Sequence, residues 1–291
     1  MNKFTLSIVL SVLMQSFAYG FITKRMGSDS ILIFVMVAFI TCSLFYFLLS
    51  RLRKITPSKA QIPCLISLNI STALAFLSFY ISITLIPASV ATLLEAAAGP
   101  LWVIIIGAAF ARKKVHLTSV VTSLVVMTCG IVSVCIISEE NFSFQTGAGI
   151  FLAVAAALGA ALVAWSSKSA ESLDISPIIV LAWRFHLTWI LSFIIYLVTP
   201  AEKVTSGDVL NSLWLVFIGV VMPMYFMQIG MQKSSPLVTM MCLSMLPLIT
   251  YIFEVSLGSN VNVYLLMAFS VGIGASFFQV WSDNFLRRKR A

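Results

Sequence analysis

Glu95, Arg184 and Glu254 lie inside apolar stretches of the sequence, and these three residues are the first candidates for chemistry. Inserting such a charge at the centre of a membrane helix costs about 2.5–3.5 kcal/mol, so intramembrane charges usually mark functional sites. Because arginine stays protonated in proteins, Arg184 requires an anion or water nearby. A carboxylate and a guanidinium in one helical bundle match the ammonium and carboxylate groups of an amphoteric solute, although Arg184 could instead pair with Glu95.

Gly99 and Trp102 follow Glu95 at helical spacing, so the three residues share one helix face. We expect this face to form a pocket wall, where Glu95 binds a substrate ammonium group, carries a proton, or does both. The alternative is a hydrogen bond between helices that stabilises the bundle. The Gly99-Pro100 step frees backbone groups and permits a kink. The predicted hinge residues are Pro87, Pro100, Pro236 and Pro247.

Polar and aromatic side chains recur along helical stripes and could line a cavity, because ligand pockets combine apolar and aromatic walls with a few polar groups. Packing or lipid contact is the alternative for each. The candidates are Asn69, Phe76 and Tyr80 on one stripe, Gln15 and Tyr19 on another, and the indoles of Trp165 and Trp183. Seven of the 13 methionines fall between Met222 and Met245, where they could fill a mobile interface or form a permissive substrate wall.

His186 and Glu254 join Glu95 as candidates for proton coupling. A lone histidine on an apolar helix is more often a packing residue, and Glu254 could be an interfacial carboxylate that reaches water. The five cysteines, Cys42, Cys64, Cys129, Cys135 and Cys242, lie in apolar runs without a CxxC pair, so we expect small buried hydrophobes. The sequence predicts no metal site, no redox site and no cofactor.

Ten apolar stretches of about twenty residues must position these side chains, and each is long enough to cross a bilayer as a helix. The chain is 60% hydrophobic and 10% charged, against about 25% charged residues in soluble domains. No break between the stretches is long enough for a soluble domain. The predicted helices are Phe4–Ile22, Ile31–Ser50, Ile62–Thr84, Ala88–Phe110, Leu117–Ile137, Thr146–Ser166, Pro177–Val198, Leu213–Gly230, Pro236–Leu257 and Val263–Trp281.

The net charge of +8 follows the predicted topology and does not indicate a nucleic-acid partner. With the N-terminus in the cytoplasm, fourteen of the 18 Lys and Arg residues fall on the inner side and three on the outer side. We therefore expect a multi-pass protein of the cell inner membrane with both termini cytoplasmic and the lipid bilayer as a partner. Residues 1–20 could instead be read as a signal peptide, which would remove the first helix.

The two halves of the chain resemble each other. Phe79, Thr92 and Pro100 match Phe226, Thr239 and Pro247 at a constant offset of 147 residues, and a weaker match at an offset of 142 follows. We therefore predict two five-helix repeats, residues 1–140 and 141–291. An odd number of helices gives the repeats opposite orientations, and such inverted repeats are typical of secondary transporters that work by alternating access.

The run Tyr80-Ile-Ser-Ile-Thr-Leu-Ile-Pro87-Ala-Ser-Val-Ala-Thr-Leu-Leu-Glu95-Ala-Ala-Ala-Gly99-Pro100-Leu resembles the EamA family of the drug/metabolite transporter superfamily. Within it, the Glu before Gly99-Pro100 is similar to the threonine/homoserine exporter branch, and Arg184 sits where many members carry an Arg. The sequence departs from the family at Lys113 and Asn260, where many members have Glu, and its second helix lacks an Arg.

The resemblance implies a secondary transporter that exports amino acids or amino-acid-derived compounds, including metallophore-like ones. An importer of a cationic or zwitterionic metabolite, such as a sulfonium or quaternary amine, is the alternative. An intramembrane enzyme or a channel is more distant, because no HExxH, GxSxG or filter-like segment occurs. Without a GxxxxGK[ST] motif, we expect no nucleotide-hydrolysing domain in this chain. We expect the protein to act as a monomer or a homodimer.

Overall fold

The computed structural model describes residues 3–26, 28–111, 117–137, 143–198 and 213–288, and within these ranges every regular element is a helix. The first half contains α1 Lys3–Arg25, α2 Ser28–Leu52, the short η1 Lys59–Gln61, α3 Ile62–Leu85, α4 Ala88–Ala111 and α5 Leu117–Ile137. The second contains α6 Phe144–Ser172, α7 Pro177–Trp183, α8 His186–Val198, α10 Leu213–Val216, η2 Phe217–Val221, α11 Met222–Lys233, α12 Pro236–Leu243, α13 Leu246–Ser256 and α14 Val263–Arg288.

Eight segments of the described chain are long and apolar enough to cross a membrane. They are Lys3–Lys24, Ile31–Leu52, Lys59–Leu85, Ala88–Ala109, Phe144–Ser172, Pro177–Val198, Leu213–Lys233 and Pro236–Ser256. Shorter apolar stretches lie in α5 and α14. Large apolar side chains such as Leu48 and Ile70 are 61% and 57% exposed, as expected for a surface that faces lipid. The protein is thus a multi-pass membrane protein.

Three predicted helices are not continuous, which corrects the sequence-based expectation. The stretch 177–198 breaks after Trp183, and the stretch 236–257 breaks after Leu243. In the second case Pro247 has no N–H to donate to the carbonyl four residues earlier, so a break one turn before it is expected. The third stretch, 213–230, contains the π-helical turn η2 just before Pro223, another residue without a backbone N–H to donate.

The predicted hinge prolines differ in their setting. Pro87 precedes α4 and Pro236 begins α12, so both lie at helix starts, where the missing N–H leaves no intrahelical bond unmade. Pro100 lies inside α4, which continues as a helix from Ala88 to Ala111 without interruption. Of the four, only Pro247 lies beside an observed helix break.

Small residues allow the closest helix contacts. A Cβ added to Gly159 of α6 would lie 2.3 Å from the backbone nitrogen of Ala75 in α3, and one added to Gly230 of α11 would lie 2.2 Å from the side chain of Ile8 in α1. Membrane helices pack by such close approach because lipid supplies no hydrophobic drive between them. These contacts bring α3 against α6 and α1 against α11, the helices that surround the candidate site.

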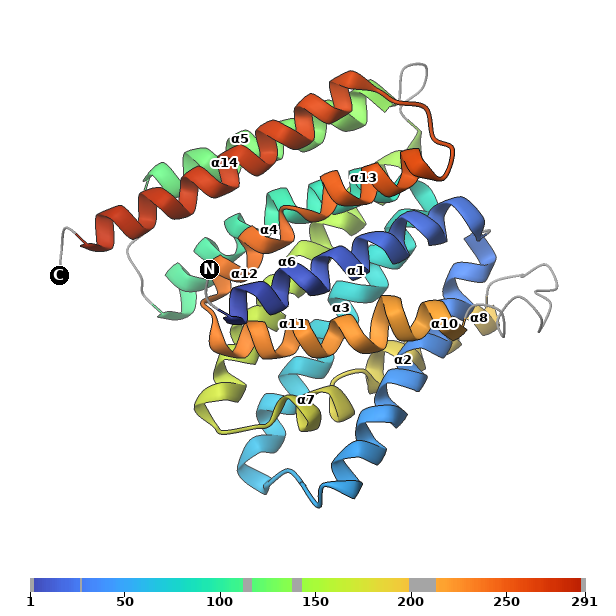
Figure 1. Cartoon of the computed structure of the whole chain (residues 1–291), viewed down its shortest axis with the longest axis vertical. Helices are drawn as coiled ribbons and strands as arrows, with labels where there is room; N and C mark the ends of the chain where they lie inside the picture. The colour runs from blue at the N-terminus through green and yellow to red at the C-terminus, as the bar shows by residue number, and fades with distance from the viewer. Residues whose placement is uncertain (1–2, 27, 112–116, 138–142, 199–212, 289–291) are drawn as a thin grey trace.

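Figure 1 shows α5 and α14 side by side at one edge of the bundle, with α1, α3, α4, α6 and α11 in its body. The first residues of α1 and the last residues of α14 lie on the same side of the bundle in this view.

Candidate functional site

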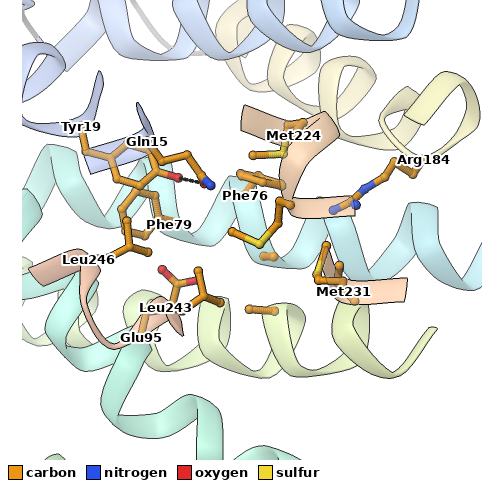
Figure 2. Close-up of a pocket in the computed structure, with 14 residues that line it drawn as sticks. Gln15, Tyr19, Phe76, Phe79, Glu95, Arg184, Met224, Met231, Leu243 and Leu246 are labelled. Atoms are coloured by element: carbon orange, nitrogen blue, oxygen red, sulfur yellow. Dashed lines mark hydrogen bonds between the residues drawn. The ribbon is translucent and has the colours of Figure 1, made fainter. Parts of the chain in front are cut away.

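A cavity of about 50 Å³ lies where α1, α3, α4, α6 and α11 meet the two helix breaks. It is lined by Gln15, Tyr19, Ala75, Phe76, Phe79, Glu95, Ala160, Val163, Arg184, Met224, Met227, Met231, Leu243 and Leu246. We call this space the central cavity (Figure 2).

Glu95 is the acidic residue of the central cavity. It lies on α4, and its carboxylate points into the space beside Leu243 in Figure 2. Within the described part of the chain, no hydrogen bond or ion pair engages this carboxylate. Because a buried charge is costly without a partner, Glu95 is either protonated or ready to bind a cationic group.

Arg184 is the basic residue of the cavity and is 2% exposed. Its Nε donates to Thr72 Oγ1 at 3.1 Å, and its NH1 donates to Gln228 Oε1 at 2.5 Å. Its guanidinium carbon lies 5.0 Å from the centroid of the Phe185 ring. Both hydrogen-bond acceptors are neutral, so the guanidinium has no counter-ion among the described residues.

The structure does not pair Arg184 with Glu95, which was one of the expected partners. The two side chains lie at opposite ends of the central cavity in Figure 2, with Phe76 and the methionines between them. An uncompensated buried cation and an unpartnered carboxylate therefore line the same cavity without contacting each other. A solute carrying both an anionic and a cationic group would satisfy both ends.

Asn69 holds the helix break that carries Arg184. Its Nδ2 donates to the Trp183 carbonyl at 2.6 Å, and its Oδ1 accepts from the Leu187 N–H at 2.8 Å. Irregular backbone in a membrane requires such partners, because lipid offers none. Asn69 was predicted to contact substrate, but it lies outside the cavity lining and acts on the backbone next to Arg184.

The aromatic end of the cavity belongs to α1 and α3. Tyr19 donates to Gln15 Oε1 at 3.2 Å, and Gln15 Nε2 donates to Ser11 Oγ at 2.8 Å, so the polar atoms of this wall are held in place. The rings of Tyr19 and Phe79 approach to 4.7 Å between centroids. Tyr19 and Phe76 line the cavity as the stripes predicted.

Besides Asn69, four predicted substrate contacts lie outside the lining. Gly99 packs against Met240, whose sulfur would lie 2.8 Å from an added Cβ, and Trp102 donates its indole N–H to the Val154 carbonyl at 3.2 Å. Tyr80 is buried within an aromatic cluster, and Trp183 is 37% exposed. Helical spacing alone therefore does not distinguish these packing residues from residues that line the cavity.

The two further candidates for proton coupling also lie outside the central cavity. His186 is half-buried, with its ring 5.6 Å from that of Trp183, and its Nδ1 has no hydrogen-bond partner among the described residues. Glu254 is 5% exposed, and its Oε1 accepts from the Ser89 N–H at 3.2 Å. Glu254 is thus largely buried.

Several cavity residues were missed by the sequence-based prediction, namely Phe79, Ala75, Ala160, Val163, Leu243 and Leu246. The two acceptors of Arg184 were missed as well. Gln228 and Thr72 each carried a weak signal, because a polar side chain in an apolar stretch needs a partner. The methionine wall of Met224, Met227 and Met231 was noted as a permissive surface, and it lines the cavity.

The described residues contain no group of three or more His, Cys, Asp or Glu side chains that could hold a metal ion. The lining has a single carboxylate, a single guanidinium, one amide (Gln15), one phenol (Tyr19) and otherwise apolar walls. This arrangement is suited to binding a small polar solute.

Residues 147–281, slightly less than half of the chain, match the family model described as EamA-like transporter family, and the match runs from α6 into α14. No curated protein matches the chain. A solved structure described as "Crystal structure of protein" is similar over 99% of both chains, with a TM-score of 0.67 and 16% sequence identity. At this identity the likeness shows the fold alone. The family match indicates a membrane transporter of small solutes.

Proposed function

Since residues 147–281 form an EamA-like transporter domain, we propose that the protein is a secondary transporter of small amphoteric solutes. It exports amino acids or amino-acid-derived compounds across the cell inner membrane by alternating access, as the threonine/homoserine exporter branch of the family would. The observation that carries this proposal is the central cavity, with Glu95 at one end and Arg184 at the other.

Charge decides the solute class. The ammonium group of an amino acid is directed to Glu95, and its carboxylate to Arg184, where Thr72 and Gln228 fix the guanidinium. A carboxylate accepts a bidentate pair of bonds from arginine, which gives orientation as well as affinity. A purely cationic solute would leave Arg184 without an anion, so the amphoteric class is favoured over a sulfonium or quaternary amine.

The helix packing supports two inverted five-helix repeats at residues 1–140 and 141–291. If α6 corresponds to α1, α10–α11 to α3, and α12–α13 to α4, then the largest contacts between the two halves have counterparts. The contact of α3 with α6 corresponds to the contact of α11 with α1. The contact of α4 with α6 corresponds to the contacts of α12 and α13 with α1. The contact of α5 with α14 is its own counterpart.

Such a repeat places the substrate site between the halves, where discontinuous helices meet. The central cavity is bounded by helices of both halves and by the breaks at residues 184–185 and 244–245. Rocking of one half against the other would then expose the cavity to each side in turn. Energy would come from a gradient, with protonation of Glu95 as the coupling step, and both termini would lie in the cytoplasm.

Thermal unfolding of the purified protein with a panel of ligands tests this proposal. The panel contains amino acids, polyamines, sulfonium compounds and amino-acid-derived chelators, each tested on the wild type, Glu95→Gln and Arg184→Gln. A ligand at one hundred times its Kd should stabilise the wild type by about 2.7 kcal/mol. We expect amino acids or their derivatives to stabilise the wild type and neither variant.

Glu171→Gln serves as the control, because Glu171 pairs with Lys168 and Lys233 outside the cavity lining. This variant should respond to ligands as the wild type does. The proposal is refuted if no amphoteric compound stabilises the wild type, or if both cavity variants respond fully. Transport in oriented vesicles then separates export from import.

A further inference from the structure

A second cavity, of about 460 Å³, lies at the ends of α1, α3 and α13 and the start of α4. We call it the outer cavity, because these helix ends lie on the predicted outer side. It is lined by Thr23, Lys24, Ile83, Thr84, Leu85, Ile86, Pro87, Ser89, Tyr251, Glu254, Ser259, Asn260 and Leu265. None of these residues lines the central cavity.

The outer cavity, like the central one, combines a buried carboxylate with a cation. Glu254 is 5% exposed and is oriented by the Ser89 N–H in the first turn of α4. Lys24 is exposed and acts on Glu254 electrostatically, but no ion pair joins the two within the described residues. Both groups line the same cavity, and they are not neutralised by direct contact.

The two cavities are one helical turn apart. On α1, Tyr19 lines the central cavity and Thr23 the outer one; on α3, Phe79 lines the central cavity and Ile83 the outer one. Four residues of helix span about 6 Å. The space between the cavities is thus as deep as a single layer of side chains on both helices.

That layer consists of aromatic rings. Tyr19 and Phe79 are 4.7 Å apart between centroids, and the Tyr80 ring lies 6.0 Å from Tyr19 and 5.8 Å from Phe79. Gln15 fixes the Tyr19 hydroxyl through a hydrogen bond of 3.2 Å. A zwitterion cannot pass ring pairs in van der Waals contact, so these rings must separate for the cavities to join.

We propose that the outer cavity is a second binding site for amphoteric solutes, with Glu254 facing the ammonium group and Lys24 the carboxylate. The Tyr19–Phe79 ring pair is the barrier between this site and the central cavity. The inference rests on the proposed transport function, since it places a second binding site on the same transport pathway. It differs from a proton-relay role for Glu254, because the solute itself contacts the carboxylate.

Cysteine labelling tests the barrier without a known ligand. In a background without the five native cysteines, Asn260→Cys reports on the outer cavity and Leu243→Cys on the central one. A membrane-impermeant thiol reagent added from outside should modify the outer cysteine at once. Modification of the central cysteine should become at least tenfold faster when Tyr19→Ala removes the ring, and Tyr19→Phe should behave as Tyr19.

Phe17→Ala is the matched control for the barrier. Phe17 lies on the same helix and makes a ring pair with Phe253 at 5.3 Å, but it lines neither cavity. Its removal should leave modification of the central cysteine unchanged. Equal acceleration by Phe17→Ala and Tyr19→Ala, or none by Tyr19→Ala, would overturn the barrier.

Charged reagents test the outer site. One unit charge about 6 Å away in water changes the local concentration of a monovalent ion about threefold, so each charge should alter the ratio of cationic to anionic labelling rates up to about tenfold. For Asn260→Cys, Glu254→Gln should lower this ratio, and Lys24→Gln should raise it. Unchanged ratios in both variants would remove the charge basis of the site.

Protection by a mixture of the standard amino acids other than cysteine, whose thiol would consume the reagent, completes the test. The mixture should slow labelling of Asn260→Cys, and Glu254→Gln should abolish this protection. If Leu243→Cys in the Tyr19→Ala protein is protected but Asn260→Cys is not, the second site is wrong while the transport proposal stands. If neither cysteine is protected, the amino-acid substrate class fails, and the second site fails with it.

Discussion

Replacing Asn69 by leucine tests whether one side chain holds the helix break at Arg184 in its binding arrangement. The change removes two hydrogen bonds, one of 2.6 Å to the Trp183 carbonyl and one of 2.8 Å from the Leu187 N–H. Hydrogen bonds between membrane helices contribute about 0.6 kcal/mol on average and up to about 1.7 kcal/mol. The two together should therefore stabilise the break by about 1–3 kcal/mol.

The loss should appear in solute binding, because Trp183 and Leu187 flank Arg184 in the chain. If the whole 1–3 kcal/mol falls on the binding-competent arrangement of Arg184, the apparent Kd rises by about 5- to 150-fold. Thermal unfolding and titration of an amino acid that stabilises the wild type would be measured on the same samples.

Ile70→Ala is the control, since Ile70 is the next residue of α3 and is 57% exposed. It should change neither the melting temperature nor the Kd by a comparable amount. The account of the helix break is refuted if Asn69→Leu binds the solute as tightly as Ile70→Ala does.

Two further changes separate packing from binding. Gly159→Val should strongly destabilise the protein in thermal unfolding, because an added Cβ would lie 2.3 Å from the Ala75 nitrogen, whereas Gly274→Ala meets nothing within 4 Å and should be nearly neutral. Trp102→Phe should cost about 1 kcal/mol in stability through its lost bond to the Val154 carbonyl, with solute affinity unchanged. Normal stability of Gly159→Val, or a large affinity loss in Trp102→Phe, would contradict these assignments.

The positions of the helices and the two central charges could be predicted from the sequence, because each depends on a strong local signal. A twenty-residue apolar run has one stable form in lipid, and a charge inside it stands out. Glu95 and Arg184, which were singled out in this way, both line the central cavity.

The break after Trp183 could not be predicted, since the residues around it contain neither Pro nor Gly. The chain can break there because Asn69, more than a hundred residues earlier, satisfies the freed backbone groups. Trp102 shows a second limit. Helical spacing places Trp102 on the same face of α4 as Glu95. Because α4 packs against α6, the indole N–H of Trp102 instead donates a hydrogen bond to the Val154 carbonyl.

Solute exchange across liposomes that carry the purified protein tests the central claim most directly. Liposomes loaded with unlabelled amino acids would be placed in a solution of the same amino acids carrying a label, and label uptake would be followed for the wild type, Glu95→Gln, Arg184→Gln and the control Glu171→Gln. The account predicts rapid uptake by the wild type and the control and at least a tenfold loss in both cavity variants. Uptake that is absent from the wild type, or equal in all four proteins, would contradict an amphoteric-solute transporter built around Glu95 and Arg184.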